Sequence, residues 1–92
     1  MSWLSIARGG LKFKHWPAEC LVFNPVNGST HLLSEFAGMV LEYLDRAERS
    51  FTEEQLQALF FDADMQSEAD QQALHQALHA FHSLGLIERA EP

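Results

Sequence analysis

The chain has 92 residues, 47% of them apolar, and this length supports one compact hydrophobic core rather than two. Thirteen Asp and Glu against six Lys and Arg give a net charge of −7, which argues against a nucleic-acid-binding surface. No apolar run approaches the roughly 20 residues that span a bilayer, so a membrane-spanning protein is not expected. The first residues show no export signal and Cys20 has no disulfide partner in the chain, so we expect a cytoplasmic protein.

Three segments near the N-terminus predict an antiparallel sheet. Residues 11–16 alternate polar and apolar side chains, which is the period of a strand, and Pro17 ends the segment. Residues 19–24 and 29–33 are apolar and partly β-branched, which also favours strands. We therefore expect two or three strands before the first helix.

A hairpin is predicted between the second and third of these strands. Asn27 and Gly28 both tolerate positive φ, so a two-residue turn is expected there. This turn would pair Phe23 with Leu32 and place Leu21 on the same face as both. A longer loop with a bulge at Gly28 would shift the register.

Three amphipathic helices are predicted after the sheet. Apolar residues recur at three- and four-residue steps over residues 34–47, 52–61 and 67–84. Thr52 and Gln55 have the spacing of a capping box, so they should open the second helix, whose buried stripe should include Leu56, Leu59 and Phe60. Gly85 is suited to end the third helix in a left-handed conformation, and Leu86 and Ile87 then return to the core.

Strands followed by helices indicate an α+β fold with a winged-helix-like shape. We expect a single domain over residues 1–92, with its core in residues 3–87 and a charged tail in residues 88–92.

The segment from Asn24 to Leu33, together with Trp16 and the closing Leu84 to Ile87, resembles the PqqD-like peptide chaperones, also called RiPP recognition elements. Within that family it is most similar to the subgroup of the HPr-related kinase system. The resemblance implies a non-catalytic domain that holds the leader of a precursor peptide and presents it to a partner, either a modifying enzyme or an HPr-kinase-related protein. It also implies that the leader binds by strand addition beside the third strand, in a groove walled by the third helix.

The candidate peptide-binding residues follow from that implication. One flank of the third helix carries Gln71, His75, His79 and His82, and the other carries alanines. Because small residues allow close packing, we expect the alanine flank to face the interior and the Gln/His flank to border the groove. The candidate residues are Thr30, His31, Leu32, Leu33, Gln71, Leu74, His75, Leu78 and His82.

Other functions receive less support from the sequence. His75, His79 and His82 have metal-ligand spacing, but a solvated Gln/His face explains them with fewer demands, so neither a metal nor another cofactor is expected. No nucleophile with a base, carboxylate pair or phosphate-binding glycine loop is apparent, so the chain is not expected to be an enzyme.

Two binding functions remain as alternatives to peptide capture. The first is a winged-helix nucleic-acid binder, which the absence of Lys and Arg from residues 68–84 disfavours. The second is a pure assembly subunit that docks on a partner protein without holding a peptide. An uncovered third strand also exposes unpaired backbone groups, and pairing of two copies of the chain would cover them. A homodimer is therefore also possible.

Overall fold

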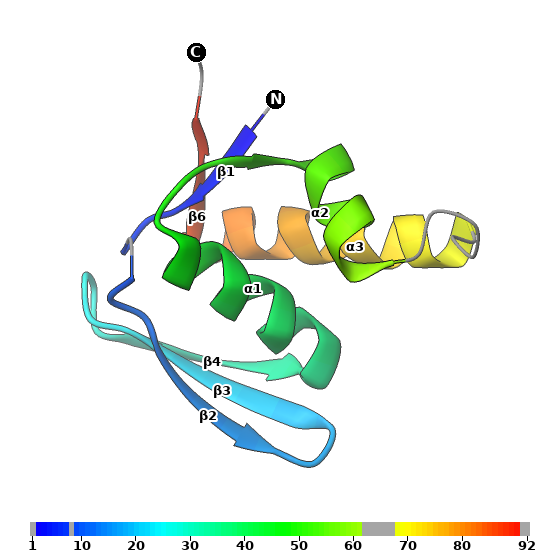
Figure 1. The fold of residues 1–92 in the computed structure, drawn as a ribbon. Coiled ribbons are helices and arrows are strands. Elements are labelled where there is room, and N and C mark those ends of the chain that lie inside the picture. The colour runs from blue at the N-terminus through cyan, green and yellow to red at the C-terminus, as the bar shows by residue number, and fades with distance from the viewer. Residues whose placement is uncertain (1, 8, 62–67, 91–92) are drawn as a thin grey trace.

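Two three-stranded antiparallel sheets and three helices form the part of the chain that the structure, a computed structural model, describes, namely residues 2–7, 9–61 and 68–90 (Figure 1). The predicted α+β class is confirmed. The elements in chain order are β1 (Ser2–Ser5), β2 (Lys12–Trp16), β3 (Glu19–Asn24), β4 (Ser29–Ser34), α1 (Glu35–Ala47), β5 (Phe51–Thr52), α2 (Glu53–Phe60), α3 (Glu68–Ser83) and β6 (Ile87–Ala90).

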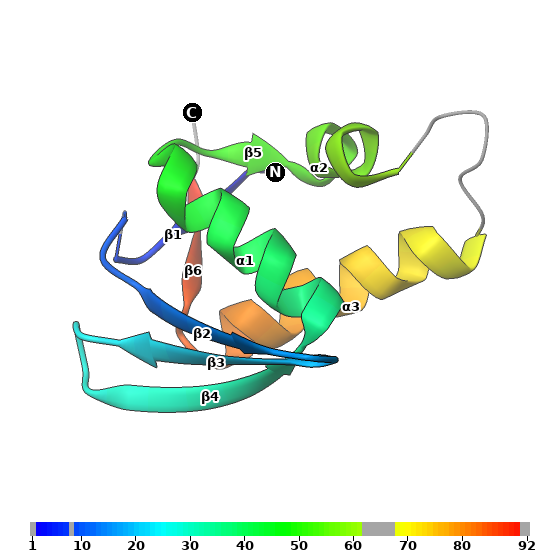
Figure 2. The same cartoon turned by 60° about the horizontal axis from the view of Figure 1, so that its bottom comes forward.

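The predicted strands form one of the sheets, in the order β2-β3-β4, and α1 lies across its inner face (Figure 2). Side chains alternate between the two faces, so Cys20, Val22 and Asn24 of β3 point toward the helix and are buried. Phe23 points to the outside and is exposed. α1 thus covers only one face of this sheet.

The hairpin exists, but its predicted two-residue turn is wrong. Asn24 pairs with Ser29, so four residues form the loop, and Phe23 lies opposite Thr30 rather than Leu32. The Gly28 amide donates to the Asn24 carbonyl at 2.8 Å, and Gly28 has a φ of 75°. The loop is two residues longer than predicted, and an even shift keeps every side chain on its predicted face.

A second sheet, in the order β5-β1-β6, was not predicted from the sequence. β1 is its central strand, paired antiparallel with β5 on one side and with β6 on the other. Residues 88–90, expected to be a charged tail, belong to β6, and Glu88 lies opposite Leu4. The two ends of the described chain therefore lie side by side (Figure 1).

One hydrophobic core joins the two sheets and the three helices. Its centre is the apolar stripe of α1 with the inward side chains of α2 and α3. The buried members are Trp3, Leu11, Val22, Val40, Leu41, Leu44, Phe51, Leu56, Leu74, Leu78, Phe81, Leu86 and Ile87.

Helix α2 begins with the predicted capping box. The Gln55 amide donates to Thr52 Oγ1 at 3.1 Å, and the Thr52 amide donates to Gln55 Oε1 at 2.9 Å. Leu56 is fully buried, as predicted, and Phe60 is partly buried. Leu59 was expected in the same stripe, but it lies on the solvent side and is 51% exposed.

Replacing Thr52 by Ala should lower the free energy of unfolding by about 1 kcal/mol, because the first turn of α2 then loses its hydroxyl acceptor. Replacing Thr52 by Ser retains an acceptor and should cost clearly less. Urea unfolding of both variants measures the difference. Equal stability of the two variants would contradict a role for the capping box.

Helix α3 ends as predicted at a left-handed glycine. Gly85 has a φ of 75°, its amide donates to the His82 carbonyl at 3.1 Å, and the Leu86 amide donates to the Phe81 carbonyl at 2.9 Å. This pair of bonds is a Schellman motif, and it directs the chain back toward the core. The predicted start at Ser67 lies outside the described residues. None of the helices in the described ranges is long and apolar enough to cross a membrane.

Candidate functional site

The free edge of β4 is the first part of the candidate site. β4 is a terminal strand of its sheet, paired only with β3. The Glu35 amide donates to the Ala18 carbonyl at 3.2 Å, and Glu35 continues the register that pairs Ser34 with Glu19. Hydrogen-bonded pairs alternate along an antiparallel ladder, so Leu33 and His31 bond to β3. The backbone N–H and C=O groups of Thr30 and Leu32 therefore point away from β3, toward the open edge, as does the Ser34 amide. The Ser34 carbonyl belongs to the first turn of α1, because Ser34 is the N-cap of that helix.

The side chains of β4 divide between the two faces of the sheet. Thr30 and Leu32 point outward and are exposed, with Leu32 60% accessible. His31 and Leu33 point toward the interior and are half-buried; Leu33 packs against the core, and His31 Nε2 lies 3.0 Å from Ser29 Oγ. An added strand beside β4 would therefore meet the exposed side chains of Thr30 and Leu32 on the outer face of the sheet. On the inner face it would meet the half-buried side chains of His31 and Leu33.

Helix α3 is turned the opposite way from the prediction. His75 Nδ1 lies 2.8 Å from Glu53 Oε1 at the start of α2, and the His75 and His79 rings are 4.3 Å apart. The His82 ring lies 5.4 Å from the ring of Trp3 in β1. The Gln/His flank of α3 thus faces β1 and α2, and the expectation that Gln71, His75 and His82 border a groove beside β4 is wrong.

The inward stripe of α3 is not available to a ligand either. Leu74 and Leu78 were candidate peptide contacts, but both are fully buried and belong to the core with Phe81. Their amphipathic spacing was correctly identified, and the whole apolar stripe of α3 is buried in the hydrophobic core. Their role is packing.

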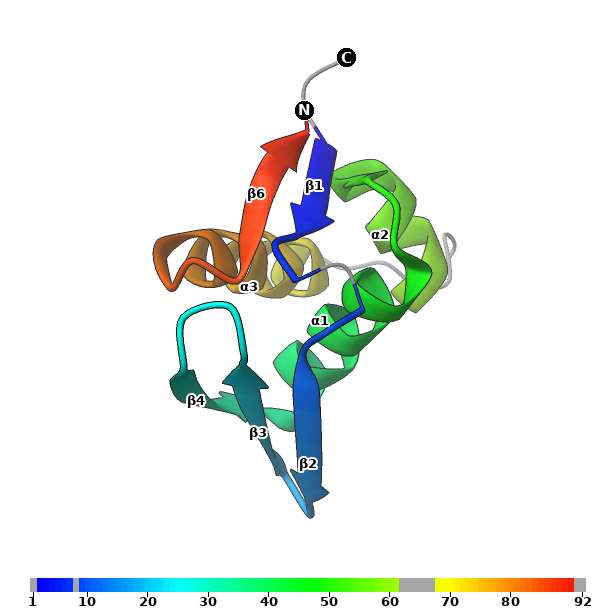
Figure 3. The ribbon, with the colours of Figure 1, turned by 90° about the vertical axis from the view of Figure 1, so that its left-hand side faces the viewer.

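The alanine flank of α3 takes the place of the predicted histidines. α3 lies between the β1–β6 pair and the β3–β4 hairpin (Figures 1 and 3). Ala73, Ala77 and Ala80 lie about 180° around the helix from the Gln/His flank, so they are on the side of the hairpin. Ala73 and Ala80 are exposed and Ala77 is half-buried against the core. These small side chains leave room for another backbone to approach α3.

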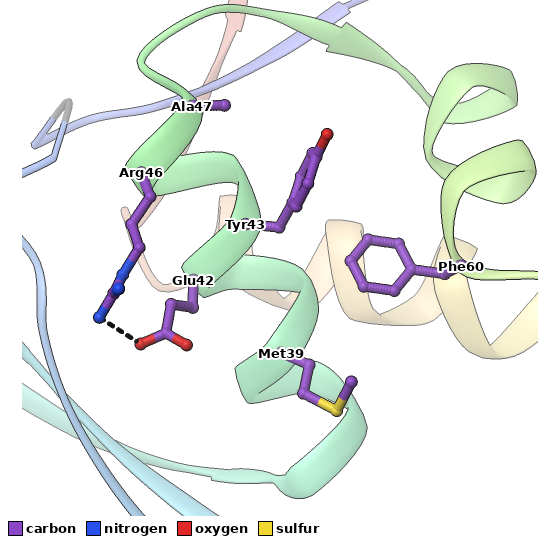
Figure 4. Close-up of a pocket in the computed structure, with 6 residues that line it drawn as sticks. All are labelled: Met39, Glu42, Tyr43, Arg46, Ala47 and Phe60. Atoms are coloured by element: carbon purple, nitrogen blue, oxygen red, sulfur yellow. Dashed lines mark hydrogen bonds and ion pairs between the residues drawn. The ribbon is translucent and has the colours of Figure 1, made fainter.

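An open pocket with a largely apolar lining lies elsewhere, between α1 and α2 (Figure 4). Its volume is about 560 Å³, and its rim carries the Glu42–Arg46 ion pair, with the charged atoms 3.0 Å apart. Met39 and Tyr43 belong to the apolar pattern of residues 34–47, yet they are 48% and 39% exposed and line this pocket. This pocket is on α1, away from the inner side of β4.

Cys20 is the single cysteine of the chain. Cys20 is fully buried, and burial, with a smaller effect from Glu42, raises the pKa of its thiol, so the thiolate nucleophile is disfavoured. Within residues 2–7, 9–61 and 68–90, no three His, Cys, Asp or Glu side chains are grouped to hold a metal ion.

Asp45 is a residue that sequence reasoning missed. Its side chain is 1% exposed and accepts hydrogen bonds from Ser5 Oγ at 2.6 Å, the Gly9 amide at 2.9 Å and the Leu11 amide at 3.2 Å. These contacts fix the segment between β1 and β2 against α1. The residue holds the two sheets in place rather than serving a ligand.

Comparison with models of protein families, with curated proteins and with solved structures returned no match to this chain.

Proposed function

We propose that this chain is a non-catalytic peptide-binding module that holds a client or leader peptide as an added strand on β4 and presents it to a partner modifying enzyme. The observation that carries the proposal is the open edge of β4, where the backbone groups of Thr30 and Leu32 and the amide of Ser34 have no partner strand in the described structure. Main-chain bonds to an added strand give affinity without requiring one particular sequence.

The surroundings of that edge support a peptide more than a nucleic acid. A strand added to β4 would lie on the side of the alanine flank of α3, where Ala73 and Ala80 are exposed. α3 has no Lys or Arg among its 16 residues, so it lacks the side chains that bind phosphates and guanines. The PqqD-like resemblance of Asn24 to Leu33 points to the same mode of binding.

The test needs a probe, because the client is unidentified. Peptides selected for binding to the immobilised chain from a displayed library of random peptides of about 12 residues supply one. Reading frames for short peptides beside the gene supply a second, independent set of probes. Isothermal titration gives the dissociation constant of each, and amide NMR shifts locate it on the chain.

Replacing Thr30 by Pro should weaken binding of such a probe about tenfold or more, because the variant loses a donor that faces the added strand. The Thr30 amide points away from β3, so the β3–β4 ladder stays intact and the fold should survive. Thr30→Ala removes the side chain but keeps the amide, and it should bind within about twofold of the parent.

A complementary test changes the backbone of the peptide instead of the backbone of β4. Two probes are compared, one N-methylated at its odd-numbered residues and the other at its even-numbered residues. Only one of the two should lose binding, because only every second residue of the peptide bonds to β4. Circular dichroism controls for folding of the proline variant. Unchanged affinity of Thr30→Pro, with amide shifts confined to α1 and α2, would refute strand addition at β4.

A further inference from the structure

The outer face of the β2-β3-β4 sheet is a second surface, and it shares with the peptide site only the outward side chains of β4. No element among the described residues covers it, whereas α1 covers the inner face (Figure 2). Trp16 on β2 is 43% exposed, Phe23 on β3 is 37% exposed and Leu32 on β4 is 60% exposed. By strand alternation the outer face consists of Lys12, Lys14, Trp16, Glu19, Leu21, Phe23, Thr30, Leu32 and Ser34.

The width of this surface suits one helix. Three strands about 4.8 Å apart span about 10 Å between the outer two, and an α-helix with its side chains is about 10 Å across. The molecule itself shows the fit, since the single helix α1 packs on the inner face of the same three strands. A second helix on the outer face would complete a helix–sheet–helix sandwich.

The charge of the outer face differs from that of the rest of the chain. Lys12 and Lys14 both lie on β2, and Lys14 Nζ is 5.2 Å from the centre of the Trp16 ring. Glu19 is the single acid on the face. Residues 35–92, by contrast, contain three Arg and twelve Asp or Glu. An acidic partner is therefore repelled by most of the molecule and attracted to this face along β2.

We propose that the outer face is the docking site for an amphipathic helix of a partner protein, with an apolar stripe over Phe23 and acidic residues beside that stripe facing Lys12 and Lys14. The proposal does not rest on peptide capture at β4, because these three residues lie on β2 and β3. A partner docked here would leave the free edge of β4 open.

Two synthetic helical peptides of about 18 residues serve as probes. Both carry leucines along one stripe, and one has Glu on the flanks of the stripe where the other has Lys. Fluorescence anisotropy of labelled probes at low ionic strength should show the Glu probe binding at least tenfold more tightly than the Lys probe. Amide NMR shifts should follow β2 and β3.

Variants of the chain assign the contact. Lys12→Glu combined with Lys14→Glu should reverse the preference between the two probes. Phe23→Ser should weaken binding of the Glu probe about tenfold, because the central apolar contact is lost. Met39→Ser, in the α1–α2 pocket, is the matched control and should leave binding unchanged. Lys12 and Lys14 are exposed, so the variants at these two residues should still fold. They therefore test the proposal even if Phe23→Ser unfolds the chain.

Three results would overturn the proposal. One is equal affinity for the two probes, including the absence of binding to either. Another is a set of amide shifts on α1 and α2 instead of β2 and β3. The third is a dimer of the chain that dissociates on Lys12→Glu with Lys14→Glu, because a second copy would then be the occupant. A Thr30→Pro variant that still docks the Glu probe separates this site from the peptide site.

Discussion

Replacing Asp45 by Ala should lower the free energy of unfolding by about 4 kcal/mol. Its carboxylate accepts from Ser5 Oγ and from the Gly9 and Leu11 amides, and it is 1% exposed. In the variant these donors lose their acceptor, and each buried donor without a partner costs about 1–3 kcal/mol. Urea unfolding followed by far-ultraviolet circular dichroism measures the loss.

Two further variants make the interpretation specific. Asp45→Asn keeps the shape but replaces one acceptor oxygen by a donor, so it should also destabilise the fold, by less than the alanine variant. Glu42→Ala removes a neighbouring acid of the same helix that forms a surface pair with Arg46, and it should change stability by less than about 1 kcal/mol. A loss at Asp45 no larger than that at Glu42 would show that the three hydrogen bonds contribute little.

Replacing Gly38 by Ala should destabilise the fold by about 2 kcal/mol, although alanine is the better helix former. In an exposed helix the change would stabilise by about 1 kcal/mol. Here the added methyl group would overlap Cys20 Cβ and lie 2.7 Å from Cys20 Sγ, which is far inside contact distance. α1 would have to move away from β3, and overpacking of this kind costs about 1–3 kcal/mol or more. Thermal or urea unfolding gives the sign directly.

The partner residue supplies the control for Gly38. Cys20→Gly removes the atoms that the new methyl group would meet, so Gly38→Ala should be far less harmful in that background than in the parent. The double-mutant cycle should give a coupling of about 1 kcal/mol or more between the two positions. A stabilising Gly38→Ala in the parent chain would mean that α1 can move off β3 at no cost.

The local elements could be predicted from the sequence because local residues determine them. Ser34 caps α1, with the Ala37 amide donating to Ser34 Oγ at 3.1 Å, and the predicted Thr52–Gln55 capping box opens α2. The hairpin was located correctly, but Asn24 forms a side-chain bond to the Val26 amide that favours the longer loop. Such turns compete closely in energy, so the pattern fixed the strands and not the loop length.

The long-range contacts could not be predicted in the same way. β1 and β6 have four residues each, which is too few for a periodic pattern to identify a strand. They are strands because their backbones pair with each other. Periodicity places Leu74 and Leu78 on the inward stripe of α3 but does not say which neighbour faces each flank. His75 lies against Glu53, 22 residues away in the sequence, and this contact shows which neighbour the Gln/His flank faces once the buried stripe is in place. Nothing in the local sequence distinguishes Asp45 from an exposed acid, because its hydrogen-bond partners Ser5, Gly9 and Leu11 lie at least 34 residues away.

The pairing of β1 with β6 also orders events during synthesis of the chain. The β2-β3-β4 hairpins and α1 contact near neighbours in sequence, so they can fold soon after they leave the ribosome. β1 emerges before all of them, yet its longest partner, Ile87–Ala90, is made last. The sheet that contains Trp3, a residue 3% exposed in the folded chain, is therefore complete only after residues 87–90 have been synthesised.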